Sequence, residues 1–134
     1  MYNRAMLKAA LEPEALQLLF KRSHFKEAQL DALLVKRSCD KNGVKLKEGL
    51  RMRDKEASLG STLRSASQAE GVISKSIASL VLAISMGLVS SSTLDAASKV
   101  ASAVEQSMLH RLDEEQFIQL TRIVDAFLQQ ASHQ

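Results

Sequence analysis

The chain has 134 residues and a formal net charge of +3, with one Pro, one Tyr, four Phe and no Trp. This length is typical of one domain that buries about two-thirds of its unfolded surface. An apolar fraction of 46% excludes a disordered chain, and the scarcity of Pro and aromatic residues favours helices over a β-sandwich. The single cysteine, Cys39, excludes an internal disulfide and predicts a cytoplasmic protein.

The charges are unevenly distributed along the chain. Residues 1–75 carry fifteen Lys or Arg and nine Asp or Glu, a balance of +6. Residues 76–134 carry three and six, a balance of −3. The first part is therefore suited to a polyanionic partner, whereas the second part would repel one.

The N-terminal part of the sequence predicts two helices. Pro13 suits the first turn of a helix that ends near Ser23. A second helix is expected from about Phe25 to Arg37, where the apolar spacing gives one inner face. The residues expected on that face are Leu30, Leu33 and Leu34.

A turn and a short helix follow. The composition of residues 40–43, Asp-Lys-Asn-Gly, predicts a turn, and residues 44–52 predict a short helix. Residues 53–56 fit either a charged connector or a continuation of that helix. Ser58 or Ser61 is suited to cap the next helix, because a serine oxygen accepts from free first-turn amides.

One long central helix is expected over about residues 61–88. Its apolar residues from Ile77 to Leu88 fall on nearly every face, which predicts burial on all sides. This half is interpreted as the hub of a monomer core or, with the last helix, as a surface buried against a second copy; the two interpretations are compatible. The change from an exposed, basic first half to an uncharged second half is expected near residues 71–75.

Two more helices complete the expected fold. The serines at 90–92 cap a helix over about residues 93–110, and Asp113 caps a last helix over residues 114–131. The 19 uncharged residues 76–94 contain too many serines for a membrane span. The fold class is therefore predicted as all-α: a compact bundle of five to six helices in a single domain, 1–134. Residues 36–70 are the candidate DNA-contacting region, and 71–131 the core and dimerisation helices.

The segment between residues 36 and 75 is strongly basic. Its order of helix, turn, short helix, connector and serine-capped helix is the order that a helix-turn-helix requires. The stretch of residues 57–69 resembles the start of a recognition helix in prokaryotic, especially archaeal, helix-turn-helix DNA-binding proteins, and the resemblance covers about residues 36–69. The ten basic residues are Lys36, Arg37, Lys41, Lys45, Lys47, Arg51, Arg53, Lys55, Arg64 and Lys75.

These features predict a DNA-binding protein, either a transcriptional regulator or a nucleoid-type protein, whose partners are double-stranded DNA and a second copy of the chain. Five cations are expected to anchor phosphates, and four residues near the start of the central helix are expected to approach bases. The phosphate anchors are Lys45, Lys47, Arg51, Arg53 and Lys55, and the base-facing residues are Ser61, Thr62, Arg64 and Gln68. The alternative is a helical protein–protein interaction or scaffold module with a merely solvated charged face, marked by an apolar groove between the last two helices.

No pattern of residues predicts catalysis. His24, His110 and His133 lack partners at metal-ligand spacing, and Cys39 is expected to be a passive, partly buried thiol. Gly-rich phosphate loops, nucleophile elbows and HExxH motifs are absent from the sequence. We therefore expect no enzyme activity, no metal, no cofactor, no membrane association and no small-molecule substrate.

Overall fold

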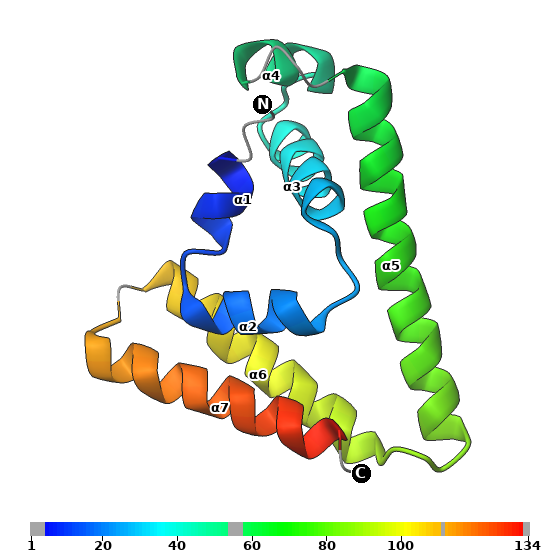
Figure 1. The fold of residues 1–134 in the computed structure, drawn as a ribbon, viewed down its shortest axis with the longest axis vertical. Helices are drawn as coiled ribbons and strands as arrows, with labels where there is room; N and C mark the ends of the chain where they lie inside the picture. The colour runs from blue at the N-terminus through cyan, green and yellow to red at the C-terminus, as the bar shows by residue number, and fades with distance from the viewer. Residues whose placement is uncertain (1–4, 54–57, 111, 133–134) are drawn as a thin grey trace. The chain divides into compact units, whose positions relative to one another are not determined.

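The computed structural model describes residues 5–53, 58–110 and 112–132, and every regular element in these ranges is an α-helix. The all-α prediction is confirmed, with more helices in these ranges than the five or six expected. None of the described helices is long and apolar enough to cross a membrane. The helices are α1 (Ala5–Ala10), α2 (Glu14–Arg22), α3 (Glu27–Lys41), α4 (Leu46–Arg53), α5 (Leu59–Ser85), α6 (Ser91–Leu109) and α7 (Glu114–Ser132) (Figure 1).

Local signals account for several helix ends. The side-chain oxygen of Ser90 accepts a 3.2 Å hydrogen bond from the Ser92 amide at the start of α6. Asp113 accepts from the Gln116 amide at 2.8 Å, and the Gln116 side chain accepts from the Asp113 amide at 3.0 Å. These reciprocal bonds form a capping box that satisfies two amide donors at the start of α7. The sequence-based predictions of both caps are confirmed.

The chain divides into two compact units. Unit 1 comprises Met1–Ala10 and His24–Ser76, and unit 2 comprises Leu11–Ser23 and Ile77–Gln134. Unit 1 carries thirteen Lys or Arg against seven Asp or Glu, and unit 2 carries five against eight. The units therefore have net charges of +6 and −3. In α5 the boundary between them follows residues 71–75, where the sequence predicts a change from a basic half of the helix to an uncharged half. That residues 1–134 form a single domain stays a prediction.

Helix α3 lies at the centre of unit 1 and packs against α1, α4 and α5. Ala32 and Leu33 meet the fully buried Ala66 of α5, and small side chains at this contact allow a close approach. Cys39 meets Leu50 of α4 in a second cluster. Because α3 is covered on several sides, its buried residues do not form the single predicted stripe: Leu30 and Leu34 are half-buried. The buried residues of α3 are Asp31, Ala32, Leu33, Val35 and Cys39.

The core of unit 2 lies between α2, α6 and α7. Ala15 of α2 joins Val104 of α6 and Val124 of α7 in one cluster, and Figure 1 shows α6 and α7 side by side. Leucines of α2 pack against this cluster. They are Leu16, Leu18 and Leu19.

In the described chain, the second half of α5 does not form the expected core hub, and its burial against a second copy stays a prediction. No residue from Gly71 to Ser92 is buried, and none of them belongs to a core cluster. Ile77 is 59% exposed and Leu82 is 60% exposed. The apolar periodicity predicts which side chains share a face of the helix, but the buried cluster of unit 2 is formed by α2, α6 and α7 and contains no residue of α5.

Candidate nucleic-acid interface

The turn between α3 and α4 sets the direction of the basic segment. Gly43 has a φ of +67°, a conformation that glycine adopts without the steric penalty of a Cβ atom. The Val44 amide donates to the Cys39 carbonyl at 2.9 Å, and the Asn42 side chain donates to the Ser38 carbonyl at 2.9 Å. These bonds satisfy carbonyls at the end of α3 while the chain reverses.

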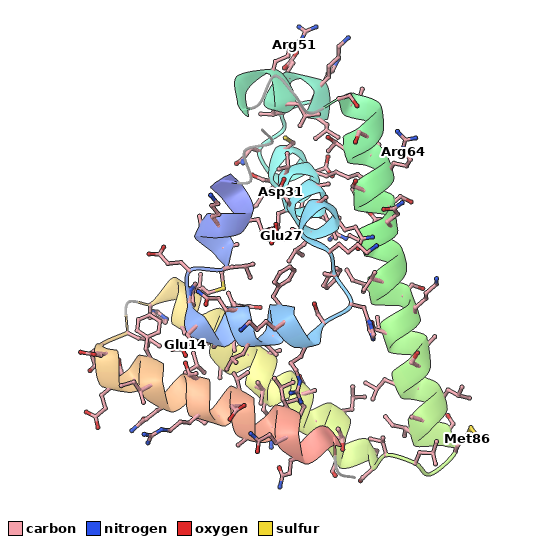
Figure 2. The ribbon with its side chains drawn as sticks, viewed as in Figure 1. Glu14, Glu27, Asp31, Arg51, Arg64 and Met86 are labelled. Atoms are coloured by element: carbon pink, nitrogen blue, oxygen red, sulfur yellow. The ribbon has the colours of Figure 1, made fainter. Side chains whose placement is uncertain are left out.

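Helix α4 has an inner apolar side and an outer basic side. Leu50 is 3% exposed and packs on α3, with the half-buried Leu46 one turn earlier. Lys47 and Arg51 are four residues apart, so they share a face of the helix, and both are exposed. Arg51 extends away from α3 (Figure 2).

Lys45 extends this basic face into the turn before α4, where its side chain is exposed. Arg53 is the last residue of α4, but its side chain lies outside the described residues. Lys55 lies outside them entirely. Predictions for these two cations therefore stay predictions. Glu48 is also exposed on α4 and offsets part of the positive charge.

The start of α5 is capped by Ser58, one of the two predicted serines. Its side-chain oxygen accepts a 3.0 Å hydrogen bond from the Ser61 amide, which replaces a bond that the first turn of a helix lacks. Ser61 and Arg64 are exposed in this first turn and a half. Arg64, like Arg51, extends away from α3 (Figure 2).

Thr62 does not fit the predicted set of base-facing residues. Its side chain is 4% exposed, and its hydroxyl donates to the Ser58 carbonyl at 2.9 Å. The hydroxyl is therefore used within the first turn of α5. Because the Thr62 side chain is buried, it is left out of the contact set below.

Two polar pairs join α3 to α5. The Gln29 side chain donates to the Gln68 side chain at 3.4 Å, so Gln68 is exposed but already partly engaged. Lys36 forms an ion pair of 3.3 Å with Glu70. The sequence does not predict either pair, because it does not show which residues of α3 lie opposite which residues of α5. Lys36 and Glu70 neutralise each other, so Lys36 is excluded from the contact set.

The exposed cations of unit 1 that remain on the turn, α4 and the start of α5 form what we call the basic surface. It consists of Lys45, Lys47, Arg51 and Arg64, and Ser61 is also exposed at the start of α5. Phosphate groups bind to such side chains, since Lys and Arg supply charge and Ser supplies a neutral donor. The arrangement holds no acid–base pair or nucleophile–base pair that would indicate catalysis among the residues named.

The described residues were also compared with the expectations for the cysteine and the histidines. Cys39 is a buried free thiol next to Gly49. No group of three or more His, Cys, Asp or Glu side chains is placed to hold a metal ion within residues 5–53, 58–110 and 112–132. His24 and His110 are exposed in different units, and His133 lies outside the described residues.

Comparison with known proteins identified no matching family model, no similar curated protein and no similar solved structure.

Proposed function

We propose that unit 1 binds double-stranded DNA through the basic surface, in the manner of a helix-turn-helix protein. The observation that carries the proposal is the number of exposed cations on consecutive elements of a positively charged unit. Four exposed cations lie on one turn and two adjacent helices of a unit whose net charge is +6. Neutralising DNA phosphates releases condensed counterions, which is the main source of affinity for such surfaces.

The order and packing of three helices support this proposal. A helix-turn-helix unit needs one helix that braces the other two, and a helix whose N-terminal turn enters the major groove. In unit 1, α3 packs against both α4 and α5, and α5 begins with exposed small residues at Gly60 and Ser61. We assign α5 as the element nearest the bases, with Arg64 able to pair with a guanine edge or a phosphate.

The alternative function has less support. An interaction module of the kind expected would offer an apolar groove between its last two helices. In unit 2, α6 and α7 pack against each other, and leucines of α2 pack against the buried cluster that these helices share. The form of DNA-binding protein that we propose is a transcriptional regulator or a nucleoid-type protein.

Equilibrium binding to a labelled duplex over a range of salt concentrations tests the proposal. If the four described cations each neutralise one phosphate, the logarithm of the binding constant falls with the logarithm of salt with a slope of about −3.6. A slope of this sign and size supports the proposal. Absence of duplex binding at low salt, or binding that does not change with salt, would overturn it.

A further inference from the structure

A chain of hydrogen bonds ends at Gln68, one of the exposed residues in the first half of α5. The Lys26 amide donates to the side-chain oxygen of Gln29 at 3.2 Å. The side-chain nitrogen of Gln29 in turn donates to the side-chain oxygen of Gln68 at 3.4 Å. All three residues belong to unit 1, and Gln29 is half-buried while Gln68 is exposed. The bonds therefore join the first turn of α3 to α5.

The direction of this chain of bonds is fixed by its first member. A backbone N–H group only donates, so the Gln29 atom that meets Lys26 is the carbonyl oxygen. The NH2 group of the same amide then faces Gln68, and an NH2 group also only donates. Gln68 must therefore meet Gln29 with its oxygen. The NH2 group of Gln68 is the part of the amide that the chain of bonds does not use.

Gln68 shares one face of α5 with two other exposed residues, Ser61 and Arg64. At about 100° per residue, Ser61 and Arg64 lie about 60° apart around the helix, and Gln68 lies between them. The guanidinium of Arg64 carries donors and no acceptor. This face therefore presents donor groups from two neighbouring side chains, the guanidinium of Arg64 and the NH2 group of Gln68.

We propose that this face selects guanine in the major groove, with Gln68 reading the base and Gln29 as its positioning residue; the inference rests on the proposed DNA binding. Guanine presents two acceptors, O6 and N7, whereas adenine presents the N7 acceptor beside the N6 donor. A glutamine that pairs with adenine uses its oxygen and its NH2 group together. The bond from Gln29 holds the Gln68 oxygen toward α3, so the adenine N6 donor would lack its partner.

Selection from a pool of duplexes with randomised base pairs, followed by sequencing of the bound fraction, tests the proposal on the full chain. The base read by Gln68 is at the position whose preference disappears in Gln68→Met. At that position we expect guanine to be enriched over adenine by about fivefold, the ratio that one hydrogen bond supplies. Adenine enrichment there, or no position that responds to Gln68→Met, overturns this inference alone. A chain that binds no duplex of the pool overturns the proposed function, and the inference with it.

Gln29→Glu tests the positioning role. A carboxylate accepts but does not donate, so the variant keeps the bond from the Lys26 amide and takes a new bond from the NH2 group of Gln68. The Gln68 oxygen then becomes the outward group, and the preference should change from guanine to bases with a donor, adenine or cytosine. The added charge weakens binding to every duplex, so base ratios are compared rather than affinities. Retention of the guanine preference overturns the assignment of Gln29.

Two further measurements separate positioning from a general effect. Gln119→Glu makes the same change at an exposed residue of unit 2 and should leave the base ratios as in the wild type. Without DNA, the NMR signals of the Gln68 NH2 protons should move to higher chemical shift in Gln29→Glu, because these protons gain a carboxylate acceptor. Unchanged Gln68 signals, or the same change of base ratios in Gln119→Glu, would overturn the positioning role.

Discussion

The hydroxyl of Thr62 donates a hydrogen bond of 2.9 Å to the carbonyl oxygen of Ser58, one turn earlier in the chain. The same carbonyl accepts the Thr62 amide at 3.0 Å, and the Ser58 side chain caps the Ser61 amide. The start of α5 is thus fixed by bonds between side chains and backbone. This leaves Ser61 and Arg64 exposed and turns Thr62 inward.

Replacing Thr62 with Val should therefore affect stability rather than DNA binding. Val keeps the shape of Thr but loses the hydroxyl, so we expect the free energy of unfolding to fall by about 1 kcal/mol. Duplex affinity at fixed salt should stay unchanged, and Thr62→Ser, which keeps the hydroxyl, serves as the control. Urea unfolding and fluorescence anisotropy measure the two effects. Weaker duplex binding by Thr62→Val at unchanged stability would indicate that Thr62 contacts DNA after all.

Gly49 and Cys39 are coupled through a close contact between α4 and α3. A Cβ atom at position 49 would lie 2.5 Å from the Cys39 sulfur, which is held in a buried cluster. Gly49→Ala should therefore destabilise the wild-type protein by about 1–3 kcal/mol of strain, less the helix propensity that Ala adds. In a Cys39→Ala background the same change should stabilise the protein by up to about 1 kcal/mol. Unfolding of the four members of this double-mutant cycle measures the coupling, and additive effects would contradict the close contact.

Two other glycines should respond to alanine in opposite directions. At Gly43, no atom lies within 4 Å of an added Cβ, so the cost comes only from the positive φ and should be about 1–2 kcal/mol. At Gly71, which is inside α5 and equally open, Ala should stabilise by up to about 1 kcal/mol. Thermal unfolding of both variants tests this contrast. Two effects of the same sign would be inconsistent with the turn at residues 42–45.

Local signals predicted much of the fold. Caps at Ser58, Ser90 and Asp113 act through side chains within three residues of the amides they satisfy, so their effect is visible in the sequence. Spacing within a helix likewise predicted that residues from Ile77 onward share apolar faces. Neither signal contains information on what packs against those faces, and this is why the sequence alone did not show that the segment lies outside the core clusters.

The candidate site was predictable only to the same extent. Exposure of Lys47 and Arg51 follows from their charge, because unpaired Lys and Arg side chains are almost never fully buried. By contrast, the inward position of Thr62 depends on the bond to Ser58, and the loss of Lys36 to an ion pair depends on how α3 and α5 pack. Such relations between helices need the three-dimensional structure.

The most direct test of the DNA-binding proposal compares two double variants that remove the same charge. Lys47→Ala with Arg51→Ala alters the basic surface, whereas Lys99→Ala with Arg122→Ala removes two exposed cations from unit 2. We expect the first variant to weaken duplex binding and reduce the magnitude of the salt slope by about 1.8, and the second to change neither quantity. Equal losses in the two variants, or a loss confined to the unit 2 variant, would contradict the assignment of DNA binding to unit 1.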